Sequence, residues 1–356
     1  MPRAAKLLVP AIGKPGARRF AATSLVTMLV ALLLSPALAA EPITLKFSFF
    51  TSDRSNIYQC QIKPFVDAVN TEGKGLIHVK VYFSGVISRV QLQQPQLVLE
   101  GIADLANVAP GYSPQLFPDT SVLELPGLFR DPREASFVFT RLVEAGALEG
   151  YKDFFVVGAF VTAGESIHSR KPIASLADLK GQTIRVNNEI EAATLRLLGA
   201  VPLLLPLNQA MDAMNRGELD GVTIPPSMLF EFGYGRLTSN HYLLQLGGAP
   251  VTLLMNRKRL MALPPRAQEI VRKYSGAWIA ERASACLAAK DREVTARLKA
   301  DPRRKVVEPS TADQATARKV FSSVVKDWAA ESPHHGELLA LVQAELSKLR
   351  SKGAAK

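Results

Sequence analysis

The chain has 356 residues and a formal net charge of +11; 47% of its residues are hydrophobic and 21% are charged. This length suits one large or two ordinary domains, and the apolar fraction excludes a largely disordered chain. Because the chain contains only 2 cysteines, a disulfide-rich scaffold is excluded as well. A polytopic membrane protein is excluded because only one stretch is apolar and long enough to approach a membrane span.

The first 40 residues have the layout of a secretory signal peptide. Five basic residues precede an apolar run at 24–34, and small residues follow at 37–40. We therefore expect export, with cleavage near Ala39 or Ala40, and the alternative is an uncleaved membrane anchor. The pair Arg18-Arg19 leaves both the general secretory route and the twin-arginine route open.

The mature chain is expected to be mildly basic. Removing the five leader charges from +11 leaves +6, spread along the sequence. Such a surplus favours anionic ligands through the overall electrostatic field, without identifying one. No basic run is interleaved with aromatic residues, so nucleic acid is not an expected partner.

Strand-like and helix-like segments alternate along the chain. In the first part we expect strands at 44–50, 77–83 and 104–109 and helices at 58–70 and 91–100. The same order returns with strands at 183–186, 201–205 and 220–224 and helices at 189–198 and 208–216. This alternation predicts an α/β fold of two lobes, each built on a parallel sheet that helices cover on both faces.

The rest of the chain is expected to return to the first lobe and then become helical. Segment 251–256 is strand-like, and a helical stretch runs from Pro264-Pro265 to about Ala300 without a breaker. At about 1.5 Å per residue, this helix would reach about 50 Å and lie across both lobes. Two further amphipathic helices are expected within 311–349.

In parallel α/β sheets, ligands collect at the carboxyl ends of the strands, where helix N-termini also point. These ends offer Phe50, Thr51, Ala109, Arg185, Asn187, Leu207, Thr223 and Ile224. Arg185 stands out because an unpaired guanidinium inside an apolar strand is costly, and its planar fork matches a carboxylate. The residues alone leave two interpretations open: an anion-binding arginine, or an arginine paired with an internal carboxylate or facing outward.

Enzyme signatures are incomplete in this sequence. Residues 164–168 begin like the turn that carries a nucleophilic serine, but His168 stands where its last glycine belongs, so Ser166 is a weak catalytic candidate. We expect His168 at the surface or at a hinge. His334 and His335 lack the spacing that places two imidazoles on one helical face, and neither a metal nor a cofactor is expected.

The two cysteines, Cys60 and Cys286, lie far apart on predicted helices. Export would permit a disulfide between them. We nevertheless expect two buried or unpaired thiols, because the sequence gives no sign of which segments meet.

The segment LADLKGQTIRV at 176–186 is the most specific of several motifs in the chain. It resembles the DLKG-x-K-hydrophobic-R-V signature of the dicarboxylate-receptor family of TRAP-type (tripartite ATP-independent periplasmic) solute-binding proteins. The others are LGA-x-P at 198–202, Asp220-Gly221 with Pro225, Phe117-Pro118, LPGLF at 125–129, and Asn256. The resemblance spans about residues 41–350.

The resemblance implies a two-lobed, periplasmic-binding-protein-like α/β fold, type II-like, with a long helix spanning both lobes. We assign 1–40 to the signal peptide, 41–163 plus 251–290 to lobe I, and 164–250 plus 291–350 to lobe II. The resemblance also implies a monomeric periplasmic receptor, not an enzyme, that traps a small organic carboxylate against Arg185 and delivers it to a TRAP-type permease. The alternatives are a receptor for an ATP-driven importer or a sensor and, more distantly, an exported hydrolase that uses Ser166.

The sequence departs from the family's pattern at positions that bear on specificity. Ile224 stands where an asparagine commonly helps to hold the carboxylate, and Ser166 stands where a second arginine is common. Phe50 and Ala109 stand at positions that contact polar substrates in sialic-acid-type members, and Leu207 stands where an aromatic residue often follows the third strand. An apolar wall disfavours polyhydroxylated ligands, because their buried polar groups would lack partners.

These departures favour an apolar or aromatic monocarboxylate, or a 2-oxo acid, as the ligand. One arginine suits one carboxylate better than two. The alternative is that Asn187, Thr51 or Thr223 restores the polarity of the site and that the ligand is a C4-dicarboxylate.

Overall fold

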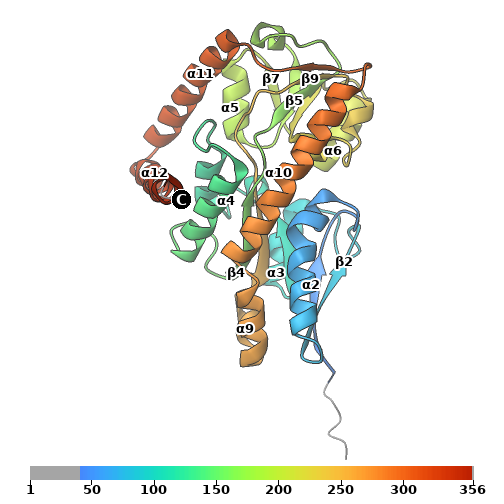
Figure 1. Cartoon of the computed structure of the whole chain (residues 1–356), viewed down its shortest axis with the longest axis vertical. Coiled ribbons are helices and arrows are strands. Elements are labelled where there is room, and N and C mark those ends of the chain that lie inside the picture. The colour runs from blue at the N-terminus through green and yellow to red at the C-terminus, as the bar shows by residue number, and fades with distance from the viewer. Residues whose placement is uncertain (1–40, 355–356) are drawn as a thin grey trace, which may run out of the picture. The chain divides into compact units, whose positions relative to one another are not determined.

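The computed structural model describes residues 41–354, so the expected signal peptide lies outside the described residues. Residues 42–354 fall within one compact unit that carries two β-sheets (Figure 1). The prediction of a mixed α/β architecture is therefore confirmed.

The first sheet has five strands in the order β2-β1-β3-β10-β4. Their bounds are β1 Ile43–Ser48, β2 Ile77–Tyr82, β3 Leu105–Val108, β4 Phe154–Val161 and β10 Pro250–Asn256. The helices that pack on this sheet include α2 Lys63–Glu72, α3 Gln94–Leu99, α4 Pro132–Glu144, α8 Arg257–Met261 and α9 Pro265–Lys273. Residues of β1, such as Leu45 and Phe47, are fully buried in its core.

The second sheet has six strands in the order β11-β9-β5-β8-β6-β7. Their bounds are β5 Ser166–Ser169, β6 Thr183–Val186, β7 Val201–Leu204, β8 Gly221–Ile224, β9 Asn240–Tyr242 and β11 Lys305–Val307. The helices of this half are α5 Glu189–Leu197, α6 Leu207–Asn215 and α7 Pro226–Leu229. Three carboxyl ends, those of β6, β7 and β8, lie side by side because these strands are parallel neighbours.

The expectation of purely parallel sheets is wrong. β10 runs antiparallel to β3 and β4, and β5 runs antiparallel to β8 and β9. The chain leaves the first sheet through β4 and returns through β10, and adjacent outgoing and returning strands must run in opposite directions. β7 is an edge strand of the second sheet, and its Val201 is 51% exposed.

The expected 35-residue helix is broken in two. α9 ends at Lys273, and α10 (Ala277–Ala300) begins after Gly276, whose φ of +59° suits glycine. α10 has 24 residues, about 36 Å at 1.5 Å per residue, and still reaches both sheets (Figure 1). Its Ala280 packs in the core of the first sheet and its Leu298 in a core of the second.

The tail folds into the two expected helices, α11 (Thr311–Ala330) and α12 (Pro333–Ala354). Phe321 of α11 packs in a core of the second sheet, whereas Val342 of α12 packs in a core that borders α4. Segment 291–350 therefore contacts both halves, and the lobe boundaries stay a prediction.

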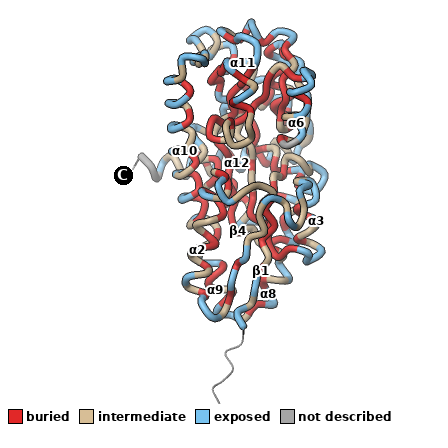
Figure 2. The backbone as a smooth tube through the Cα atoms, turned by 90° about the vertical axis from the view of Figure 1, so that its right-hand side faces the viewer, coloured by how far each residue is buried: buried red, intermediate tan, exposed pale blue. Residues whose placement is uncertain are grey.

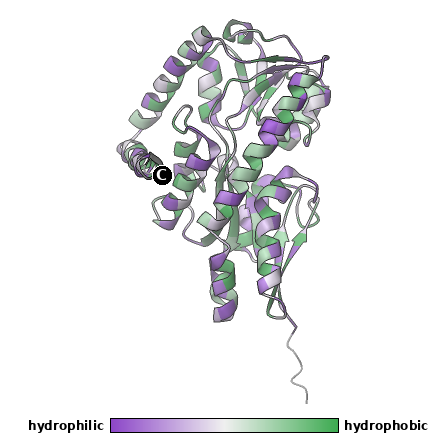
Figure 3. Cartoon of the chain, in the orientation of Figure 1, coloured by the Kyte–Doolittle hydropathy of each residue, from purple (hydrophilic) through white to green (hydrophobic). Residues whose placement is uncertain are grey.

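Burial follows the sheets. Figure 2 shows buried residues gathered along the strands, with exposed residues on the outward turns of the helices. Figure 3 shows hydrophilic and hydrophobic residues interspersed along α10 and α11, as expected for helices with one solvent face. Within residues 41–354, none of the helices combines the length and hydrophobicity needed to cross a bilayer.

The expectation of two unpaired thiols is wrong. Cys60 lies in a π-helical turn (Tyr58–Ile62) before α2, and Cys286 lies on α10; the two form a disulfide with a Cα–Cα distance of 5.4 Å. A sequence separation of 226 residues hides this pairing from the sequence. It follows from the path of α10, which packs against this turn.

Candidate ligand-binding site

A cavity of about 60 Å³ lies between the two sheets. Five of the nine predicted site residues line it, at the ends of strands from both halves: Phe50, Ala109, Asn187, Leu207 and Ile224. Further apolar side chains, among them Ile57, Met228 and Phe232, complete a largely apolar wall. In this conformation the cavity has room for a few water molecules.

The other four predicted residues do not line the cavity. Thr223 Oγ1 hydrogen-bonds to Glu191 Oε2 at 2.8 Å. Ser166 is buried on β5, in register with Ile224 of β8. Arg185 and Thr51 do not line the cavity either, and Thr51 Oγ1 is buried without a hydrogen-bond partner among the described residues.

Arg185 is fully buried on β6, and oxygen atoms satisfy its guanidinium. Nε donates to Leu205 O at 2.7 Å, Nη1 to Thr223 O at 3.2 Å and Nη2 to the Tyr112 hydroxyl at 2.9 Å. Within residues 41–354 the guanidinium forms no direct ion pair. Its charge nevertheless acts on the nearby buried carboxyl groups of Glu165 and Glu191, and the role of Arg185 stays a prediction.

Tyr112 connects the two halves at this point. It follows β3 of the first sheet, lines the cavity, and places its hydroxyl oxygen against the second sheet. That oxygen accepts from Arg185 Nη2 and, at 3.2 Å, from the backbone N–H of Leu207, the first residue of α6. The Tyr112 hydroxyl itself donates to Asn187 Oδ1 at 3.3 Å. Sequence reasoning missed Tyr112, because nothing in the loop after β3 marks the direction of its ring.

Three polar atoms in the cavity wall are buried without a hydrogen-bond partner among the described residues: Gln91 Oε1, Asn107 Nδ2 and Glu165 Oε2. Buried polar groups are rarely left unpaired, because the loss of hydration costs free energy. A ligand that carries complementary polar groups would satisfy them. Sequence reasoning missed all three residues.

A second buried carboxyl lies next to Glu165. Glu191, in the first turn of α5, accepts from Asn187 N at 2.9 Å and from Thr223 Oγ1, and Asn188 caps the same helix. Burial raises the pKa of both Glu165 and Glu191, and the nearby Arg185 guanidinium lowers them only in part. The neighbouring Glu191 charge raises the pKa of Glu165 further.

Further hydrogen bonds link the half that carries the first sheet to the half that carries the second. Asn56, in the segment between β1 and the turn Tyr58–Ile62, donates its backbone N–H to Glu231 Oε2 at 2.9 Å and its side-chain amide to Ser227 O at 2.7 Å. Burial raises the pKa of Glu231 to about 7. Together with those of Tyr112, these hydrogen bonds join the two halves beside the cavity.

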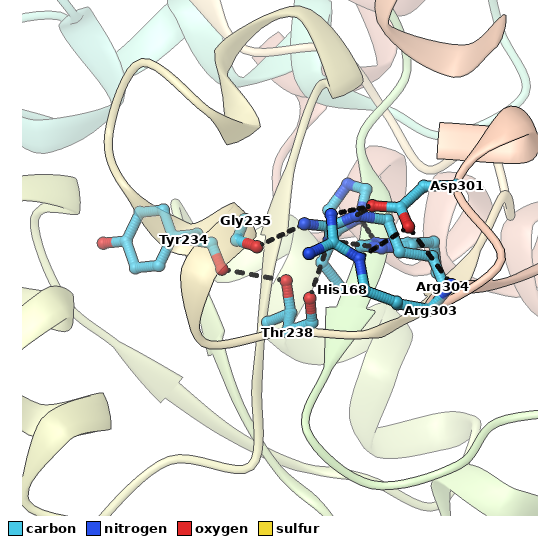
Figure 4. Close-up of polar contacts among 8 residues, drawn as sticks. His168, Tyr234, Gly235, Thr238, Asp301, Arg303 and Arg304 are labelled. Atoms are coloured by element: carbon cyan, nitrogen blue, oxygen red, sulfur yellow. Dashed lines mark hydrogen bonds and ion pairs between the residues drawn. The ribbon is translucent and has the colours of Figure 1, made fainter. Parts of the chain in front are cut away.

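His168 is a buried residue, and the expectation that it lies at the surface or at a hinge is wrong. It faces His241 of β9 in register, with their Nδ1 atoms 2.7 Å apart. His168 Nε2 donates to Ile224 O at 3.1 Å, so His241 Nδ1 donates to His168 Nδ1, and His241 Nε2 accepts from Arg304 at 3.2 Å. Arg304 is fixed in turn by Gly235 O, Thr238 O and Asp301 (Figure 4).

This histidine pair predicts a specific pH dependence of stability. Burial lowers the pKa of His168 to about 3 and that of His241 to about 4. Between pH 6.5 and 4 the unfolded chain binds protons that the folded pair excludes, so each histidine costs about 1.4 kcal/mol of unfolding free energy per pH unit of acidification. The His241→Gln variant should lose less stability than the wild type from pH 6.5 to 4.5 in urea titrations. Parallel pH curves for the two proteins would contradict this arrangement.

The comparisons with known proteins agree with this geometry. Residues 47–332 match a profile of the DctP family, described as bacterial extracellular solute-binding protein, family 7. The chain belongs to this family. The prediction from the sequence motifs is thereby confirmed, and so is the two-lobed fold.

Several relatives and solved structures are similar to the chain. It is 28% identical over 184 residues to the uncharacterized protein YiiZ of Salmonella typhimurium, a match that spans 49% of this chain and only 55% of that protein. It is 26% identical to the C4-dicarboxylate-binding periplasmic protein DctP of Rhodobacter capsulatus, over 56% and 61% of the two chains. A TRAP solute-binding protein from Rhodoferax ferrireducens, solved with copurified benzoate, has a TM-score of 0.79 and 26% identity, over 88% and 99% of the chains.

The family and its similar solved structure are described as solute-binding proteins. Both ring nitrogens of His168 are engaged by His241 and Ile224, which leaves neither free to activate Ser166 as a hydrolase would require. Among the described residues, no group of three or more histidine, cysteine, aspartate or glutamate side chains is placed to hold a metal ion.

Proposed function

We propose that the mature protein is a periplasmic receptor that captures a small monocarboxylate with an apolar or aromatic body, or a 2-oxo acid, between two lobes. It then delivers this ligand to a TRAP-type permease. Closure around the ligand is a hinge motion, and the ligand stabilises the closed form by binding it more tightly than the open form.

The observation that carries this proposal is the environment of the Tyr112 hydroxyl oxygen. It accepts hydrogen bonds from Arg185 Nη2 and from the backbone N–H of Leu207 at the N-terminus of α6. A buried guanidinium and a helix N-terminus are donors that favour a negative charge. A ligand carboxylate oxygen that displaces the Tyr112 hydroxyl would receive the same two hydrogen bonds.

The rest of the cavity supports an apolar ligand body. Phe50, Leu207, Ile224, Met228 and Phe232 offer no hydrogen-bonding side chains, so ligand hydroxyls facing them would lose hydration without compensation. The similar receptor from Rhodoferax ferrireducens retained benzoate through purification. An aromatic acid combines the required carboxylate with the required apolar face.

A thermal-shift screen tests the proposal. The panel holds benzoate, mandelate, a branched 2-oxo acid, succinate and glucuronate. A ligand at about 100 times its Kd adds about 2.7 kcal/mol to the unfolding free energy, so a specific ligand raises the melting temperature clearly. We expect shifts with the apolar monocarboxylates. If only succinate or glucuronate raised the melting temperature, the protein would still be a carboxylate receptor, but the proposed specificity for apolar ligands would be refuted.

A C4-dicarboxylate is the second candidate ligand. The likeness to the DctP protein of Rhodobacter capsulatus favours it, as do Asn107 and Asn187 in the cavity wall. A second carboxylate would need a second cationic partner, and among the described residues that line the cavity there is no lysine or arginine. We therefore rank it below the monocarboxylate.

A further inference from the structure

Glu165 is an acidic residue inside a cavity to which we assign an anionic ligand. It lies directly before β5, is 1% exposed and lines the cavity. Its Oε2 atom is buried and has no hydrogen-bond partner among the described residues. Within the described wall it is the only carboxyl group, and Tyr112 is the only other titratable one. An ionised Glu165 would repel a bound carboxylate.

The charges around Glu165 come from two elements. Arg185 on β6 and Glu191 on α5 are the charged groups that act on it, and Glu191 in turn raises the pKa of the buried Glu124. Glu191 holds the hydrogen bonds that stabilise an ionised carboxylate, from Asn187 N and Thr223 Oγ1. Arg185 and an ionised Glu191 together are neutral. Little positive charge then remains to stabilise a second carboxylate at Glu165.

A neutral carboxyl group needs an acceptor for its proton. Glu191 and Thr223 lie within hydrogen-bonding range of the Glu165 carboxyl group. The Oε2 atom of Glu165 nevertheless has no hydrogen-bond partner among the described residues, and a ligand carboxylate in the cavity would offer it an acceptor oxygen. Hydrogen bonds from a carboxylic acid to a carboxylate are charge-assisted and strong. We propose that Glu165 binds the ligand as a neutral carboxylic acid that donates its proton to an oxygen of the bound carboxylate. This inference rests on the proposed function and adds Glu165 to Arg185 as a determinant of specificity.

The proton balance makes the inference measurable. Where Glu165 is already protonated, a carboxylate binds without net proton exchange. Above the pKa of Glu165 in the free protein, each bound carboxylate must bring one proton from solution. Affinity should then fall up to tenfold for each further pH unit. The receptor would therefore bind its carboxylate ligand most tightly at the acidic end of its pH range.

Isothermal titration with benzoate and with mandelate from pH 5.5 to 9 tests this prediction. The wild type should lose affinity towards high pH and take up a proton there, measured in two buffers of different ionisation enthalpy. Glu165→Gln keeps a neutral donor of the same shape, so it should bind within about threefold of the wild type at pH 6, with no pH dependence. Glu149→Gln, which removes an exposed carboxyl group outside the cavity, is the matched control and should keep the wild-type profile.

A measurement without ligand tests the neutral state separately. The unfolded chain ionises Glu165 above about pH 4.3 and the folded chain does not. The folding equilibrium constant of the wild type should therefore fall, relative to Glu165→Gln, by up to tenfold per pH unit from about pH 5 to 7. No such fall would show that Glu165 is ionised and would overturn the inference.

Other outcomes separate the two proposals. Binding of either acid that is independent of pH, or a loss of more than tenfold in Glu165→Gln at pH 6, overturns the role of Glu165 and leaves the receptor intact. Absence of binding of both acids to the wild type at every pH overturns the proposed specificity, and the inference falls with it.

Discussion

Replacing Arg185 by alanine should weaken binding of the best ligand about 30-fold to several-thousand-fold. Truncating one partner of a buried, charge-assisted pair typically costs about 2–5 kcal/mol. Arg185 is fully buried, and its Nη2 is committed only to the Tyr112 hydroxyl, a partner that a carboxylate can displace. Isothermal titration of both proteins with benzoate and mandelate measures the effect.

The Arg185→Ala variant must be shown to fold, because the Arg185 guanidinium also donates hydrogen bonds to Leu205 O and Thr223 O. Urea titration should show that the variant is still folded at the assay temperature. Arg185→Lys, which keeps the charge and loses the planar fork, should lose at least tenfold in affinity. Arg236→Ala is the matched control: Arg236 is exposed on the same half, and its side chain makes no hydrogen bond within residues 41–354. Unchanged affinity in Arg185→Ala would make Arg185 a structural residue.

Removing the Cys60–Cys286 disulfide should lower the unfolding free energy by about 3–5 kcal/mol. A cross-link between residues 226 positions apart restricts the unfolded chain strongly, and the chain-entropy account gives a large stabilisation for such a loop. It also ties α10, which packs in both halves, to the turn before α2. Urea titration of the Cys60→Ala, Cys286→Ala double variant measures the loss.

The wild type treated with a reductant provides the control for this prediction. It should match the untreated double variant, and the reductant should leave the double variant unchanged. A difference below about 1 kcal/mol between oxidised wild type and double variant would show that the bond adds little to stability. If the reductant also destabilised the double variant, the loss of stability in the reduced wild type could not be assigned to breaking the Cys60–Cys286 disulfide.

Local sequence patterns predict the elements whose partners are near in sequence. The strands β1, β2, β3, β6 and β8 all lie close to their expected positions, because each is a short apolar or alternating run between turn residues. The direction of β10 and the pairing of Cys60 with Cys286 depend on contacts across roughly 90 and 226 residues. Periodicity carries no information about such contacts. The break at Gly276 was visible only as a single glycine, which a helix tolerates at about 1 kcal/mol.

The site was predictable where it follows from strand ends. Phe50, Ala109, Asn187, Leu207 and Ile224 line the cavity because the carboxyl ends of neighbouring strands meet there. Tyr112 and Glu165 lie in segments next to strands, and their orientation depends on the opposite half of the molecule. For Glu165, the sequence offered one signal: it is a polar residue next to the expected site residue Ser166.

A crystal structure of the mature protein with bound benzoate tests the central claim most directly. We predict a carboxylate oxygen within hydrogen-bond distance of Arg185 Nη2 and the Leu207 N–H, with the Tyr112 hydroxyl displaced and the ring against Phe50, Met228 and Phe232. Benzoate bound elsewhere, or bound in this cavity with its carboxylate turned away from Arg185, would contradict the account.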